Sequence, residues 1–123
     1  MARRYLALTL AAVVAASVLA AGALARRSAA PTLVGTAGPG FTITLKQNNG
    51  VVKTLKAGTY TLVIHDKASI HAFSLDGPHG YAKDFTAVPF VGTKTFTVKL
   101  KAGKYKYYCA PHESFMFGRF TVT

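Results

Sequence analysis

The chain has 123 residues, a single cysteine and a formal net charge of +11 at pH 7. This length leaves room for one domain, and a lone cysteine excludes an internal disulfide framework and any metal site that needs two cysteines. The excess of basic over acidic residues favours binding to acidic partners or anionic envelope polymers. No nucleic-acid-binding motif is present, so nucleic acid is not an expected partner.

The N-terminal segment, residues 1–25, is predicted to be a signal peptide or an N-terminal membrane anchor. Arg3 and Arg4 precede a nearly all-apolar run that ends in the small residues Ala23-Leu24-Ala25, as before a cleavage site. The run is also close to the ~20 residues that span a bilayer, and Arg26-Arg27 would hinder cleavage. Either alternative places the folded part outside the cytoplasm, in the periplasm or cell envelope or secreted.

Residues 26–39 are small, polar and rich in proline and glycine, which is typical of a flexible lead-in or linker. From residue 40 the pattern changes, because Phe41, Ile43 and Leu45 alternate with polar residues as in a half-buried strand. Asn48-Asn49-Gly50 then favours a hairpin turn, with a return strand over 51–55. We therefore expect one folded domain over residues 40–123.

A short internal repeat follows. Leu55-Lys56-Ala57-Gly58-Thr59-Tyr60 reappears as Leu100-Lys101-Ala102-Gly103-Lys104-Tyr105, and each copy reads as strand, tight turn and strand. Between the copies, residues 76–81 read as a loop, and residues 84–92 as irregular structure or a short helical turn. Two similar hairpin halves indicate a Greek-key sandwich.

Strands over 93–100, 104–109 and 118–122 bring the expected total to about seven, in an all-β, Greek-key β-sandwich. The expected core residues are the inward members of the alternating patterns: Phe41, Ile43, Leu62, Ile64, Phe73, Leu75, Phe96, Val98, Leu100, Tyr105, Tyr107 and Phe120.

Three metal donors lie within eight residues near the C-terminus: Cys109, His112 and Met116. A thiolate, an imidazole and a thioether are what copper accepts, since Cu(I) prefers soft ligands and Cu(II) binds imidazole nitrogen. A fourth donor must come from elsewhere, and His71 is the best candidate, with His65 and His79 as competitors. Two imidazoles and a thiolate with a weak axial methionine describe a blue-copper electron-transfer site.

The pattern Cys109-x2-His112-x3-Met116, with His71 upstream, resembles the cupredoxins, the plastocyanin/azurin/amicyanin group. The resemblance covers roughly residues 40–122. It implies one type 1 copper ion held by His71, Cys109, His112 and Met116. It also implies that the outer edge of His112 reaches the surface and serves as the electron exit.

Two positions next to the ligands depart from many members of this family. Asn often follows the first histidine, and Ser or Thr follows the cysteine, whereas this chain has Ala72 and Ala110. A side-chain link between the two ligand segments cannot form, but the backbone N–H of Ala72 can still donate to the Cys109 sulfur. Pro111 fixes φ between two ligands and stiffens the loop.

The sequence favours an electron carrier that transforms no substrate, and not an enzyme. We expect a monomer that docks redox proteins bearing acidic surfaces. An apolar collar around His112 would include Pro78, Phe115 and Phe117, ringed by lysines. The alternatives are an extracytoplasmic copper chaperone or buffer that uses the same ligands, and a metal-free adhesion module in which Cys109 is incidental.

Overall fold

The computed structural model describes residues 28–123. The predicted signal peptide or anchor lies outside these residues. Within the described range, no helix has both the length and the apolar character needed to cross a bilayer.

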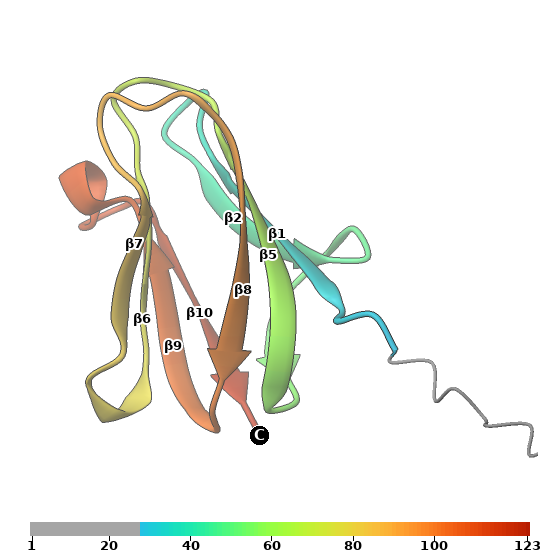
Figure 1. Cartoon of the computed structure of the whole chain (residues 1–123). Helices are drawn as coiled ribbons and strands as arrows, with labels where there is room; N and C mark the ends of the chain where they lie inside the picture. Colours follow the sequence, from blue (N-terminus) through green and yellow to red (C-terminus); the bar gives the residue numbers. More distant parts are fainter. Residues whose placement is uncertain (1–27) are drawn as a thin grey trace, which may run out of the picture.

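Two five-stranded sheets pack face to face, as Figure 1 shows. The first sheet has the order β3-β2-β1-β5-β8, formed by β1 (Thr32–Ala37), β2 (Ile43–Gln47), β3 (Gly50–Val51), β5 (Gly58–Asp66) and β8 (Gly92–Leu100). The second has the order β4-β10-β9-β6-β7, formed by β4 (Thr54–Leu55), β6 (Phe73–Asp76), β7 (Ala82–Thr86), β9 (Gly103–Tyr108) and β10 (Phe117–Val122). Two short 3-10 turns complete the described fold: η1 (Pro78–Gly80) and η2 (Ala110–His112).

The predicted all-β sandwich is confirmed, but residues 28–123 form ten strands, not about seven. The flexible lead-in predicted over 26–39 is wrong for Thr32–Ala37, which form β1. This strand lies inside its sheet, antiparallel to β2 and parallel to β5. Its main-chain groups are therefore paired on both sides, which outweighs a composition that favours loops. Residues 84–86, expected in irregular structure, belong to β7.

The internal repeat in the sequence is also a repeat in structure. Gly58 and Gly103 open β5 and β9 with φ of +156° and +147°, a conformation that favours glycine. Two residues later each strand carries a buried tyrosine whose hydroxyl donates back across the turn: Tyr60 to the carbonyl of Lys56 at 2.6 Å, and Tyr105 to that of Lys101 at 2.9 Å. The same hydrogen bond from a tyrosine hydroxyl therefore stabilises both turns.

Alternation along the strands fills the space between the sheets. Tyr60, Leu62 and Ile64 on β5 face inward, and so do Tyr105 and Tyr107 on β9. Aromatic rings continue across this interior: Phe73 stacks on Tyr107, and Tyr105 stacks on Phe120. Of the expected core, Ile43 and Phe96 are only partly buried. Phe41 is not in the core at all, because it is 58% exposed and precedes β2.

Candidate metal centre

The predicted ligands gather at one end of the sandwich because the strands that lead to them end there. Cys109 directly follows β9, and His71 lies in the loop from β5 to β6, the strand that pairs with β9. The turn after Cys109 is closed by main-chain hydrogen bonds. The N–H of His112 donates to the carbonyl of Cys109 at 2.9 Å, and the N–H of Cys109 donates to the carbonyl of Met116 at 3.0 Å.

Three of the predicted donors face one another. The Nδ1 atoms of His71 and His112 are 3.3 Å apart. The Cys109 sulfur is 3.8 Å from Nδ1 of His71 and 3.5 Å from Nδ1 of His112. Among the described residues, these three form a group able to hold a metal ion, with all ligand atoms within 4.8 Å of one another.

These separations fit a single first-row metal ion. Three donors in a plane, each about 2.0–2.3 Å from the ion, would stand about 3.5–3.8 Å from one another. The three observed distances lie close to that range. A set of two imidazoles and one thiolate with trigonal spacing suits copper, as in a type 1 copper site.

The ligands differ in their access to solvent. His71 and Cys109 are completely buried, whereas His112 is only partly buried. Of these three ligands, His112 is therefore the one that meets solvent. Burial also protects the lone thiol from oxidation, which an exposed cysteine outside the cytoplasm would risk.

The hydrogen bond to sulfur expected from the Ala72 backbone is present. The N–H of Ala72 lies 3.4 Å from the Cys109 sulfur. It links the segment after His71 to the segment that carries the thiolate, where side chains in the family often do so. Pro111 lies at the start of η2, between Cys109 and His112.

Met116 is 1% exposed and lies at the end of the same turn. Its N–H donates to the carbonyl of His112 at 2.8 Å, and its carbonyl accepts from Cys109. The main chain therefore ties Met116 to both neighbouring ligands. Its role as the axial donor stays a prediction.

The two competing histidines lie away from this group. His65 points its Nδ1 at the hydroxyl of Thr93, 2.8 Å away, on the neighbouring strand β8. His79 is exposed in η1, which follows β6 at the other end of the sandwich. Of the three candidates for the upstream imidazole, the structure brings only His71 to Cys109.

The predicted apolar collar is partly wrong. Pro78 lies at the opposite end, where a Cβ added to Gly103 would stand 2.5 Å from its ring. Phe115 is 59% exposed with its ring 5.5 Å from that of His112. Phe117 is 40% exposed, and its ring contacts the cations of Lys106 and Arg119. The part that Phe115 and Phe117 play in docking stays a prediction.

Phe41 is the site residue that the sequence interpretation missed. Its ring lies edge-on to both histidine ligands, 5.5 Å from His71 and 5.1 Å from His112 between centroids. It also contacts Phe115 at 5.8 Å. The neighbouring Gly-Pro-Gly segment was the available signal, because it places Phe41 in a loop and not in a strand.

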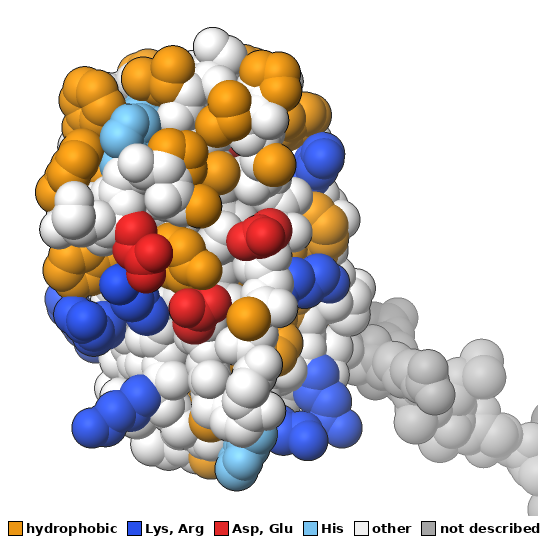
Figure 2. Space-filling model, turned by 90° about the vertical axis from the view of Figure 1, so that its left-hand side faces the viewer, with side chains coloured by type: hydrophobic (Ala, Val, Ile, Leu, Met, Phe, Trp, Pro, Cys, Tyr) orange, Lys and Arg blue, Asp and Glu red, His pale blue; other side chains and the backbone are white. Residues whose placement is uncertain are grey.

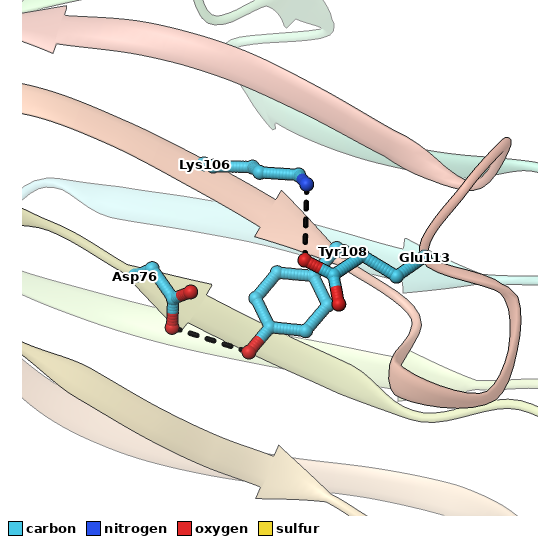
Figure 3. Close-up of polar contacts among 4 residues, drawn as sticks. All are labelled: Asp76, Lys106, Tyr108 and Glu113. Atoms are coloured by element: carbon cyan, nitrogen blue, oxygen red, sulfur yellow. Dashed lines mark hydrogen bonds and ion pairs between the residues drawn. The ribbon is translucent and has the colours of Figure 1, made fainter.

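A polar cluster flanks the thiolate on the outer face of the second sheet (Figure 3). The hydroxyl of Tyr108, the residue before Cys109, donates to Asp76 at 3.2 Å, and Lys106 pairs with Glu113 at 3.0 Å. Burial, followed by the negative charges of Asp76, Glu113 and Asp84, raises the pKa of Tyr108 to about 12. This tyrosine is therefore neutral at any physiological pH.

Comparison with known proteins agrees with this geometry. Residues 13–123 match the family model of copper binding proteins of the plastocyanin/azurin family. A comparison with curated proteins finds no match.

Solved structures of the copper protein rusticyanin share the fold. Reduced rusticyanin is 24% identical, with 75% of this chain and 78% of that chain covered, at a TM-score of 0.54. Rusticyanin from Thiobacillus ferrooxidans is 22% identical, covering 75% of this chain and 76% of that chain, also at a TM-score of 0.54. The family match spans most of the chain and includes all four predicted ligands. The chain therefore belongs to the plastocyanin/azurin family of copper binding proteins, the cupredoxins.

Proposed function

We propose that this protein is an extracytoplasmic electron carrier whose single type 1 copper ion is held by His71, Cys109 and His112, with Met116 as the axial donor. Copper bound there would accept one electron on passing from Cu(II) to Cu(I) and return it to a second protein. The observation that carries the proposal is the pre-shaped donor group, two Nδ1 atoms and one thiol within 3.3–3.8 Å of one another.

The protein holds these donors firmly. Main-chain hydrogen bonds close the turn from Cys109 to Met116, and the Ala72 N–H fixes the sulfur. A site that keeps its shape needs little rearrangement when its charge changes, which favours fast electron transfer. A copper chaperone or buffer must release its ion, and a donor group with two fully buried members opposes release.

The partly exposed His112 marks the surface through which we propose that electrons pass. Phe41, Ile70 and Phe115 are each at least half exposed around this end and form what we call the apolar end. In Figure 2 hydrophobic side chains gather at the top of the molecule near one histidine. A small apolar surface suits brief docking, since interfaces of less than ~1,200 Å² are typical of redox encounters.

The expected partners are redox proteins with acidic rims around their docking surfaces. Lys67 lies in the loop that carries His71, and Lys94 lies near the start of β8 at the same end. Their charges would speed the approach of an acidic partner more than they would strengthen the final complex. We propose that the protein acts as a monomer and transforms no substrate.

The visible absorption of the purified, copper-loaded protein tests the proposal. We expect an intense band from charge transfer between the Cys109 sulfur and Cu(II), and fast electron self-exchange between oxidised and reduced protein. Cys109→Ser should lose the band, whereas His65→Gln and His79→Gln should keep it. An intense band with slow self-exchange would favour a copper store, and a protein that binds no copper would favour an adhesion module.

A further inference from the structure

The end of the sandwich opposite the metal ligands carries a cluster of exposed lysines. Lys53 precedes β4, and Lys56 lies in the turn from β4 to β5. Lys99 is the second-last residue of β8, Lys101 lies in the turn from β8 to β9, and Lys104 is the second residue of β9. We call these five residues the basic end. β9 runs from this end to Cys109, so Lys104 and Cys109 are separated by about 17 Å of extended chain.

The charges of the basic end are unpaired. Among residues 28–123 the one ion pair joins Lys106 and Glu113, and none of the five lysines stacks on an aromatic ring. The acidic side chains lie elsewhere: Asp66 is buried, Asp76 and Asp84 accept hydrogen bonds within the second sheet, and Glu113 pairs with Lys106. Figure 2 shows acidic side chains in the middle of one face, with basic ones mostly beside and below them.

The shape of this end suits a broad anionic surface. The lysines come from turns and strand ends of both sheets and not from one cavity. Two shallow hollows lie among them, one of about 180 Å³ lined by Lys99 and Lys101, and one of about 300 Å³ lined by Lys53 and Lys104. Cations spread over several turns can each meet a different anionic group, as at a surface of charged headgroups.

The course of the chain indicates that the anionic surface is a lipid bilayer. β1 begins at Thr32, which pairs with Thr61, three residues from the start of β5 at the basic end. Preceding β1 in the sequence are Arg26-Arg27 and the apolar run from Tyr5 to Ala25. An apolar run of this length is close to what spans a bilayer, and lysines near an anionic bilayer surface are attracted to its headgroups.

We propose that the basic end binds the surface of a bilayer that contains anionic phospholipid. This arrangement turns the apolar end, with His112, away from the lipid and towards soluble partners. The inference goes beyond the proposed function and does not depend on it, because the lysines would bind lipid whether or not the opposite end carries electrons.

Vesicle co-sedimentation of the full chain as purified, with its N-terminus read by mass spectrometry, tests the proposal. Vesicles of phosphatidylcholine alone are compared with vesicles containing phosphatidylglycerol. The variant Lys99→Gln/Lys101→Gln/Lys104→Gln removes three charges from the basic end. The control Lys67→Gln/Lys83→Gln/Lys94→Gln removes three exposed charges elsewhere, and the visible spectrum or circular dichroism checks that both variants are folded.

We expect the first variant to bind anionic vesicles at least about tenfold more weakly than the unmodified protein, since each lysine near a charged bilayer contributes about a fivefold factor. The control should lose much less, and binding to neutral vesicles should be the same for all three proteins. Equal losses in the two variants, or no dependence on phosphatidylglycerol, would overturn the proposal. Tighter binding to soluble polyphosphate than to anionic vesicles, through the same lysines, would also overturn it in favour of a soluble polyanion.

Discussion

Gly38 lies directly against the imidazole of His71. A Cβ built on Gly38 would stand 2.6 Å from Cδ2 and 3.3 Å from Nε2 of His71, and the φ of Gly38 is +76°. The residue after β1 therefore leaves room for the buried ligand ring to turn its Nδ1 towards Cys109. The sequence interpretation missed β1, and the residue that follows this strand contacts a predicted metal ligand.

Gly38→Ala should displace His71 and weaken copper binding. The added methyl group meets the ring, and alanine at a positive φ is itself strained, so we expect the free energy of unfolding to fall by about 1–3 kcal/mol. Copper affinity by competitive titration and denaturant unfolding measure the two effects. Gly40→Ala is the matched control, because a Cβ there has no neighbour within 4 Å. Equal behaviour of the two variants would contradict this account of Gly38.

Phe41→Ala should speed the loss of copper to a chelator with little change in stability. The Phe41 ring packs against the rings of His71 and His112, so we expect its removal to open the ligands to solvent. Because the ring is 58% exposed, we expect a change in unfolding free energy of less than about 1 kcal/mol. Phe117→Ala is the control, since that ring contacts Lys106 and Arg119. If both variants released copper at the same rate, Phe41 would have no role as a cover.

Removing copper should destabilise the protein. An ion that binds only the folded chain stabilises it by about 4 kcal/mol when its free concentration is ~1,000 times Kd. Denaturant unfolding with and without a chelator measures this difference. Cys109→Ser should remove most of it, because the thiolate is the softest donor in the group. A chelator-dependent difference that survives in Cys109→Ser would place the stabilising ion elsewhere.

The proton on Tyr108 links the acidic cluster to alkaline stability. Burial, and then Asp76, raises the pKa of Tyr108 to about 12 from 10. The unfolded chain therefore loses this proton at a lower pH than the folded protein does. The resulting contribution to stability is intact below about pH 10 and is lost as the pH rises towards 12.

Asp76→Asn should lower the pKa of Tyr108, because it removes the nearest negative charge, although burial still keeps the value above 10. The ring resonances of Tyr108 followed by NMR against pH measure the shift. Glu113→Gln should give a smaller change, since Glu113 contributes less than Asp76. A larger effect from Glu113→Gln than from Asp76→Asn would contradict the arrangement in Figure 3.

Local patterns in the sequence predicted the parts of the fold that depend on local chemistry. Strict alternation marked the inward faces of β5 and β9, and the spacing of Cys109, His112 and Met116 marked a turn that carries ligands. His71 could be chosen over His65 only through the family resemblance, because His65 lies near the end of β5 and His71 follows five residues after the strand ends.

The errors concern relationships between distant segments. β1 is a strand because β2 and β5 pair with it, and the composition of residues 32–37 gives no sign of either partner. Phe41 continues the alternation of β2 by two residues beyond the strand, so the pattern placed it in the core. Pro78 was assigned to the ligand end although β6 runs away from that end before the chain reaches it.

The axial position is the remaining ligand assignment, and Met116→Gln tests it through the reduction potential. A thioether is a soft donor that favours Cu(I), whereas the harder oxygen of an amide favours Cu(II), so we expect the potential to fall in the variant. Met116 is 1% exposed, so the side-chain amide of the new glutamine needs a partner inside the protein. The predicted ligand set offers the copper ion as that partner. Voltammetry of the copper-loaded proteins measures the change.

Met116→Leu is the control for packing, because it keeps a similar volume but supplies no donor atom, and it should not lower the potential. A potential that is the same in all three proteins would show that the Met116 sulfur does not reach the copper and fills space in the core instead.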